Sequence, residues 1–150
     1  MQRIMIVGNS GSGKSTLARQ LGEILNVPVI HADALLFLED GAWKERTKDE
    51  YHAIIFDAIS QDSWVFEGGG MSTFAQRHER CEAIVFIDFK RFFCLYRITK
   101  RRMQIKKKPR PELPKGCVDR LERKFVKWVF WDYYKGRRPR LLQAIEVSNK

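Results

Sequence analysis

The chain has 150 residues, 44% of them hydrophobic, a formal net charge of +10, and three widely spaced cysteines without C-x-x-C pairing. This length fits one domain with one core, and the cysteines indicate neither a disulfide framework nor a zinc site, so we expect a protein of the reducing cytoplasm. No apolar stretch approaches the roughly 18 residues of a membrane-spanning helix, and the N-terminal segment leads into a strand rather than a signal peptide.

The first predicted unit is a strand over residues 3–7, a loop over 8–13 and a helix from about 14 to 26. Residues 8–15 read GNSGSGKS, which matches the phosphate-binding motif G-x-x-x-x-G-K-[ST]. Small residues let backbone N–H groups turn toward phosphate, and the helix N-terminus favours an anion. Lys14 can reach the β- and γ-phosphates, and Ser15 can offer its hydroxyl to Mg²⁺. We predict ATP and Mg²⁺ as cofactors, and the expected ATP-binding residues are Gly8, Ser10, Gly11, Ser12, Gly13, Lys14, Ser15 and Thr16.

The middle of the chain alternates apolar runs with helical segments. We predict strands over residues 27–30, 63–66 and 83–87, and helices over about 47–61 and 72–80. Such apolar strands are typical of a parallel sheet buried on both faces, and the intervening helices imply right-handed crossovers. The predicted fold class is therefore α/β, with a doubly wound parallel sheet in a single domain over 1–150.

The C-terminal part is strongly basic. Residues 90–150 hold 20 Lys/Arg and 5 Asp/Glu, whereas residues 1–89 hold 8 and 13. We predict a helix to about 103, a lid-like segment rich in Lys and Pro at about 104–117, and a long aromatic helix that breaks near Gly136 before a short one at about 139–146. The basic block suits nucleic acid or the phosphates of a small substrate, and a solvated basic face is the alternative.

Polar residues follow the second and third predicted strands. Ligands of parallel sheets bind at the carboxyl ends of the strands, so these residues are candidates for one site. We assign Glu67 to Mg²⁺ together with Ser15, through a bound water, because hard oxygen ligands suit this ion. His31 and Asp33 are expected to contact the phosphate acceptor, with Asp33 as base or hydrogen-bond acceptor. The alternatives are a surface acid for Glu67 and a helix cap for Asp33.

The triple glycine and several arginines complete the expected acceptor and phosphate contacts. Gly68 and Gly69 let a substrate approach the backbone closely, although a flexible turn has the same composition. We also expect Arg77 to contact the acceptor. Near the lid, arginines can clamp phosphates during transfer, and a solvated surface role is the alternative for each. The arginines placed in the catalytic machinery are Arg101, before the lid, and Arg120, after it.

These motifs resemble the P-loop kinases of the adenylate kinase-like type and, within them, the bacterial family of FlaR-like DNA topology modulation proteins. The matching segments are GNSGSGKST at 8–16, HAD at 31–33, EGG at 67–69, IVFIDF at 84–89 and RLERKFVKWVFWDYYKGRRPR at 120–140. The resemblance implies a three-layer α/β/α fold with strand order 2-3-1-4-5, Arg97 against the adenine ring and Arg101 on a phosphate. Two departures are Glu67 in place of Asp and a fifth strand that is missing or vestigial.

The acceptor is less well defined than the donor site. His31, Asp33 and the triple glycine also resemble the acceptor site of shikimate-type kinases. Our leading hypothesis is an ATP-dependent phosphotransferase that acts on a small molecule, with a nucleotide as the favoured acceptor. The alternative is a nucleotide-binding regulator that binds DNA through its basic C-terminal half and has weak or no kinase activity. The sequence leaves the oligomeric state open.

Overall fold

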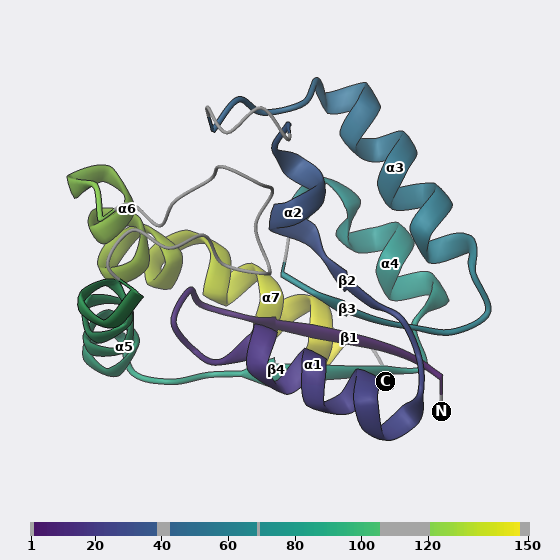
Figure 1. Ribbon diagram of the computed structural model, residues 1–150, viewed down its shortest axis with the longest axis horizontal. Coiled ribbons are helices and arrows are strands. Elements are labelled where there is room, and N and C mark those ends of the chain that lie inside the picture. Colours follow the sequence, from purple (N-terminus) through teal and green to yellow (C-terminus); the bar gives the residue numbers. More distant parts are fainter. Residues whose placement is uncertain (1, 39–42, 69, 106–120, 148–150) are drawn as a thin grey trace.

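A computed structural model describes residues 2–38, 43–68, 70–105 and 121–147. Its centre is a four-stranded sheet in the order β2-β3-β1-β4, in which all neighbouring strands are parallel (Figure 1). The strands are β1 (Arg3–Gly8), β2 (Val29–His31), β3 (Trp64–Glu67) and β4 (Ala83–Ile87). The predicted order 2-3-1-4 is confirmed, and the described residues contain no fifth strand.

Helices cover both faces of the sheet, as the alternation along β1 requires. Ile4 and Ile6 of β1 pack with Ala18 of α1 (Lys14–Leu25) on one face. Met5 and Val7 point to the other face. The core there receives buried side chains from α2 (Ala32–Leu36), α3 (Lys48–Ser60), α4 (Phe74–Arg80), the π-helical segment η2 (Trp128–Arg137) and α7 (Arg138–Glu146). The result is the predicted three-layer α/β/α arrangement.

The N-terminal boundaries follow the sequence with small shifts. Thr47 and Glu50 form both halves of the predicted capping box at the start of α3. The second strand begins later than predicted, at Val29, because Pro28 has no N–H for the ladder. The carbonyl of Pro28 still accepts a hydrogen bond from Val65 N. The strand ends at His31. A short helix, α2 (Ala32–Leu36), was not predicted, and it begins directly after β2.

The predicted break near Gly136 is wrong. The helix α6 (Arg123–Lys127), then η2 and α7, follow one another without interruption from Arg123 to Glu146. Gly136 is exposed, and a Cβ there would meet no atom of the described residues within 4 Å, so these residues give the chain no packing reason to turn there. Pro139 lies in the first turn of α7 but inside this continuous helix, so its missing N–H removes one backbone hydrogen bond to the preceding turn.

The remaining helical segments lie after β3 and beyond the carboxyl ends of the strands. A 3₁₀ turn, η1 (Met71–Thr73), leads into α4, and α5 (Arg91–Ile105) follows β4 at the left of Figure 1. The predicted lid therefore overlaps α5 at residues 104 and 105, and its other residues lie outside the described part of the chain. No helix within the described ranges is long and apolar enough to span a membrane.

Candidate active site

The phosphate-binding motif forms a tight loop between β1 and α1. Gly11 has a φ of +80°, and a Cβ there would collide with the Cys94 carbonyl and the Ile98 side chain of α5. Only glycine therefore lets the loop lie this close to α5. The hydroxyl of Ser12 is buried and has no hydrogen-bond partner among the described residues. A buried orphan hydroxyl in an anion-binding loop is suited to a ligand oxygen, so the loop fits a bound phosphate.

Lys14 begins α1 and points back over the loop. Its Nζ donates a 2.9 Å hydrogen bond to the carbonyl of Asn9. Burial lowers the pKa of the Lys14 ammonium, and the negative charges of Glu67 and Asp33 partly offset this effect. The ammonium is thus held at the loop, where an anion would find a partly desolvated cation. Thr16, the last residue of the matched motif, lies in the first turn of α1 and is exposed.

Asn9 links the loop to the far end of the chain. Its buried side chain donates a 2.8 Å hydrogen bond from Nδ2 to the carbonyl of Val129 in η2, and its Oδ1 accepts one of 2.8 Å from Ser10 N. Sequence reasoning missed this role, because Asn9 occupies a position at which the motif accepts any residue. No local signal could have identified Val129 as its partner.

Glu67 lies at the end of β3, beside the loop, and is almost fully buried. Its Oε1 accepts hydrogen bonds from Ser15 Oγ at 3.0 Å and from His31 Nδ1 at 2.8 Å. Burial acts to raise the pKa of this carboxyl, but the hydrogen bond from His31, the charge of Lys14 and the hydrogen bond from Ser15 outweigh it and leave the pKa below its ordinary value. Glu67 is therefore a carboxylate at neutral pH.

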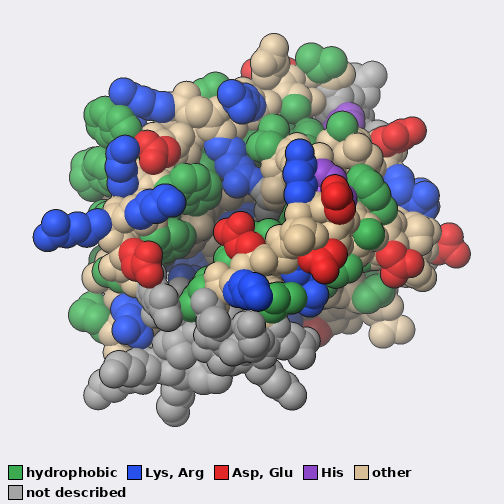
Figure 2. Space-filling model, turned by 90° about the horizontal axis from the view of Figure 1, so that it is seen from above, with side chains coloured by type: hydrophobic (Ala, Val, Ile, Leu, Met, Phe, Trp, Pro, Cys, Tyr) green, Lys and Arg blue, Asp and Glu red, His purple; other side chains and the backbone are tan. Residues whose placement is uncertain are grey.

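A pocket with about 450 Å³ of empty space, part of it open to solvent, adjoins the loop. Figure 2 shows a hollow with Lys and Arg side chains in it on the face seen from above. The polar side of the pocket is formed by Ser10 and Lys14 with Asp33 of α2 and Gly68. Its other walls are formed by Val7, Gly8, Met71, Phe74, Trp128, Arg137 and Leu141.

Arg137 enters this pocket from η2, and sequence reasoning did not assign it a role. Burial lowers the pKa of its guanidinium, while the phenol of Tyr133 and the carboxylate of Asp33 raise it. Within the described part of the chain it forms no ion pair, and it lies 5.9 Å from the ring centre of Trp128. The only feature of the sequence that pointed to Arg137 was the Arg-rich end of the segment 120–140. That segment contains several arginines, so it does not distinguish Arg137 from the others.

Arg77 lies behind the pocket wall rather than in it. Its guanidinium is fully buried and donates to the carbonyls of Gly68, at 3.3 Å, and of Gly70, and its Nε donates to Thr73. It also lies 4.7 Å from the ring centre of Phe66. Burial lowers the pKa of Arg77 to about 10, so it remains a cation. These contacts support the turn after β3. They do not test the contact with the acceptor expected for Arg77, which stays a prediction.

The other predicted site residues are distributed unevenly. Asp33 is exposed in the first turn of α2 and lines the pocket, whereas His31 is the residue that precedes the helix and faces Glu67. Asp33 is therefore not the cap of this helix.

Arg97 donates a 3.3 Å hydrogen bond to the carbonyl of Ser12, beside the loop. Arg101 lies one turn further along α5, half-buried and outside the set of pocket-lining residues. Gly69 and Arg120 lie outside the described residues.

Known proteins similar to this chain are kinases. No protein-family model matches the sequence. Over 79 residues the chain is 34% identical to shikimate kinase of Haemophilus influenzae (strain PittEE). This stretch is 53% of the chain and 34% of the relative, so the chain spans about a third of the length of the curated relatives that it matches. The narrower resemblance to FlaR-like proteins is not confirmed.

Solved kinase structures match the fold of this chain over most of its length. A shikimate kinase from Bacteroides thetaiotaomicron has a TM-score of 0.58 and 25% sequence identity, with 92% of this chain and 80% of that chain covered. A gluconokinase from Sinorhizobium meliloti 1021 has a TM-score of 0.51 and 21% identity, with 95% and 97% covered. The chain therefore has the α/β fold of the P-loop kinases.

Proposed function

We propose that this chain is an ATP-dependent kinase that transfers the γ-phosphoryl group to a hydroxyl of a small anionic acceptor. The observation that carries this proposal is that Lys14, Asp33 and Arg137 line one pocket. Such a pocket holds a cation for the donor phosphates, a carboxylate for the acceptor hydroxyl and a second cation for an anionic group of the acceptor. The fold and the kinase names of the similar proteins support the same reaction.

The proposed step is a direct displacement at the γ-phosphorus. The acceptor hydroxyl oxygen forms a bond to this phosphorus, and the bond from the phosphorus to the β,γ-bridging oxygen breaks, so that ADP leaves with the electron pair. The hydroxyl proton passes to the carboxylate of Asp33. Lys14 and the N–H groups of the loop stabilise the negative charge on the phosphate oxygens. Catalysis in this scheme depends on positioning and charge stabilisation.

The donor set beside the loop fits Mg²⁺. Ser15 offers a hydroxyl and Glu67 a carboxylate, and Mg²⁺ in kinase sites takes few protein ligands and keeps water and phosphate oxygens for the others. Within the described ranges no three His, Cys, Asp or Glu side chains gather as metal ligands, so the protein would supply only part of the shell. When bound, the ion would neutralise part of the charge of the ATP phosphates.

The acceptor that we favour is a hydroxylated carboxylic acid. Shikimate and gluconate, after which the similar shikimate kinases and gluconokinase take their names, both carry hydroxyls and one carboxylate. A carboxylate can form a bidentate pair with a guanidinium such as that of Arg137, and the apolar wall of Met71, Phe74 and Leu141 suits a carbon skeleton. A nucleotide, the acceptor expected from the sequence, would offer a phosphate to the same cation and is the second choice.

Formation of ADP tests the proposal. Purified protein with ATP and Mg²⁺ is incubated with shikimate, gluconate and a panel of nucleoside monophosphates, and ADP release is measured against a reaction without acceptor. We expect acceptor-dependent ADP release with a hydroxylated carboxylic acid and its loss in Lys14→Ala. Release with nucleoside monophosphates alone would favour the nucleotide acceptor, and no release with any acceptor would contradict the kinase proposal.

The alternative function, a nucleotide-binding regulator that contacts DNA through the basic C-terminal half, rests on the charge asymmetry. That function needs the 20 Lys/Arg of residues 90–150 but has no need of Asp33 and Arg137 in one pocket. The pocket is the reason that we place the kinase first. Salt-sensitive binding of duplex DNA together with no ADP release would reverse this order.

A further inference from the structure

The outward surface of α5 and η2 carries aromatic rings that the pocket does not use. Phe92 and Tyr96 of α5 are 71% and 59% exposed, and Trp131 of η2 is 44% exposed. Large aromatic side chains are usually buried, and a gathering of exposed rings on one surface marks an interaction site more often than scattered single ones. Other rings of η2, those of Trp128 and Tyr133, pack in the core, whereas the ring of Trp131 does not.

These rings alternate with positive charges in direct contact. The guanidinium of Arg91 lies 5.3 Å from the ring centre of Phe130 and 5.7 Å from that of Trp131. Phe92 meets Phe130 edge to face, with 5.0 Å between ring centres, so α5 and η2 form one continuous surface. We call this surface the α5–η2 patch and define it by Arg91, Phe92, Tyr96, Lys100, Trp131 and Lys135.

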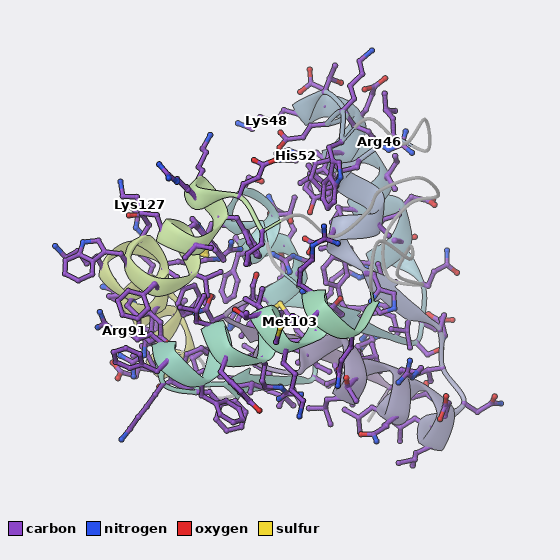
Figure 3. All side chains as sticks on the ribbon, turned by 60° about the vertical axis from the view of Figure 1, so that its left-hand side comes forward. Arg46, Lys48, His52, Arg91, Met103 and Lys127 are labelled. Carbon is purple, nitrogen blue, oxygen red and sulfur yellow. The ribbon has the colours of Figure 1, made fainter. Side chains whose placement is uncertain are left out.

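The two lysines of the α5–η2 patch continue the alternation. Lys135 Nζ lies 4.4 Å from the ring centre of Trp131, and Lys100 Nζ lies 5.8 Å from that of Tyr96. Phe92, Tyr96 and Lys100 follow one another at intervals of four residues, so they share a face of α5 at a spacing of about 6 Å. In Figure 3, α5 crosses the front of the molecule from Arg91 to Met103.

Charge limits the partners that this surface can accept. The helix α5 contains five Lys/Arg and no Asp/Glu. On the left of Figure 2, Lys and Arg side chains stand among hydrophobic ones, with a smaller number of Asp and Glu side chains. A second copy of the chain would bring the same positive charges to an interface, which opposes self-association through this face. A polyanion would be attracted, and one whose repeating units also carry flat apolar rings would use both kinds of side chain.

We propose that the α5–η2 patch binds single-stranded nucleic acid. Unpaired bases stack on exposed aromatic rings, and neighbouring cations neutralise the phosphates, with little dependence on sequence. Bases in a duplex are already stacked on each other, so the rings of Phe92 and Tyr96 would contribute nothing to duplex binding. None of the six residues of the patch is among the described residues that line the pocket. The proposal is therefore independent of the kinase function.

Binding of a labelled oligonucleotide tests the proposal. The full chain, without ATP, is titrated into fluorescein-labelled oligothymidylate or oligouridylate of about 16 nucleotides, a length that such surfaces occupy, and fluorescence anisotropy is measured at several salt concentrations. We expect tighter binding to the single strands than to a duplex of equal length, with affinity that falls as salt rises. Equal or tighter duplex binding would overturn the proposal. Equally effective competition by polyglutamate would overturn it in favour of an acidic protein partner.

Ring removal separates stacking from simple charge attraction. The double variant Phe92→Ala/Tyr96→Ala should weaken single-strand binding by about tenfold or more, the loss expected for one stacked base. The matched control is Phe56→Ala, which removes a 40% exposed ring from α3 and should change nothing. The ring-preserving variant Phe92→Tyr/Tyr96→Phe should bind like the wild type. Wild-type affinity in the double alanine variant would overturn the proposal.

A charge control completes the design. Lys135→Ala should lower the slope of log affinity against log salt by about one phosphate contact, whereas Lys48→Ala should leave the slope unchanged. Lys48 belongs to α3, and Figure 3 shows it on a different part of the molecule from Arg91. Equal effects of the two lysine variants would show attraction by net charge alone and would overturn the patch as the site. Thermal unfolding of each variant verifies that it is folded.

Discussion

The side-chain amide of Asn9 donates a 2.8 Å hydrogen bond to the carbonyl of Val129, 120 residues further along the chain. Asn9 belongs to the phosphate-binding loop, and Val129 belongs to the π-helical segment that carries Trp128 and Arg137 to the pocket. One hydrogen bond therefore joins the donor side of the candidate site to its acceptor side. Both partners are buried, so loss of this bond would leave a polar group that water cannot reach, at a cost in folding free energy.

Replacement of Asn9 should destabilise the protein. In Asn9→Ala the amide donor and the acceptor for Ser10 N are both lost, and we expect a decrease of about 1–3 kcal/mol in the free energy of unfolding. Asn9→Asp keeps the acceptor but has no donor for Val129, so it should be no more stable than Asn9→Ala. Urea denaturation measures both. An unchanged midpoint in Asn9→Ala would show that the link contributes nothing.

Replacement of Lys14 should separate activity from stability. Lys14→Ala removes the cation at the phosphates, and phosphoryl transfer should fall by about 10²–10³-fold. The partly desolvated ammonium contributes little to folding, so the melting temperature should stay within a few degrees of the wild type. Acceptor-dependent ADP release and a thermal melt give the two values. Lys48→Ala, at an exposed position of α3, is the control for loss of one lysine. Wild-type turnover in Lys14→Ala would contradict the assignment.

Arg137 and Arg138 are neighbours in sequence with different expected effects. Arg137 lines the pocket, and Arg137→Ala should raise the KM for an anionic acceptor roughly 10- to 100-fold, the cost of one charged hydrogen-bond partner. Arg138 pairs with Asp88 on the surface, so Arg138→Ala should leave the KM unchanged. Initial rates over a range of acceptor concentrations test this. Equal effects of the two variants would remove Arg137 from acceptor binding.

Glu67 should make stability depend on acid pH. Its folded-state pKa lies below the ordinary value of 4.5, so the ionised carboxylate stabilises the fold above that value, and this contribution is lost as the pH falls through the folded-state pKa. Glu67→Gln should be less stable at pH 7 and should lose less stability than the wild type between about pH 5 and pH 3. Urea midpoints across this range measure the difference. Glu23→Gln, an exposed change on α1, should follow the wild-type curve, and an identical acid profile in Glu67→Gln would contradict the role.

Removal of Arg77 should be costly because its guanidinium is the donor for buried carbonyls. Arg77→Ala leaves the carbonyls of Gly68 and Gly70 without this donor and opens a cavity beside Phe66, and we expect a loss of about 3–5 kcal/mol. Chemical denaturation provides the value. Arg80→Ala, on the exposed side of the same helix, should cost far less. A loss below about 1 kcal/mol in Arg77→Ala would show that the turn after β3 does not depend on this cation.

Local patterns were sufficient for most of the fold. The strands β1, β3 and β4 could be predicted from their apolar runs, because strands buried on both faces exclude polar residues. The capping box at Thr47 is readable because it is a contact between residues three positions apart. The phosphate-binding loop is readable because its glycines are required by backbone conformation at fixed spacing. Asp33 and Glu67 could be nominated as site residues because they follow strands whose carboxyl ends meet at one edge.

Contacts between distant segments were not readable. The continuous helix through Gly136 and its π-helical geometry differ from the expected break because the same residues are compatible with several helical registers, and packing selects one. Met71, Phe74 and Leu141 have the same apolar character whether they fill the core or line a pocket. Arg137 is one of several arginines near the end of the chain, and only the position of η2 against the loop brings it opposite Asp33. Short-range spacing thus identifies the phosphate-binding half of the site, whereas the acceptor half depends on long-range packing, because its walls come from segments that meet only when the chain has folded.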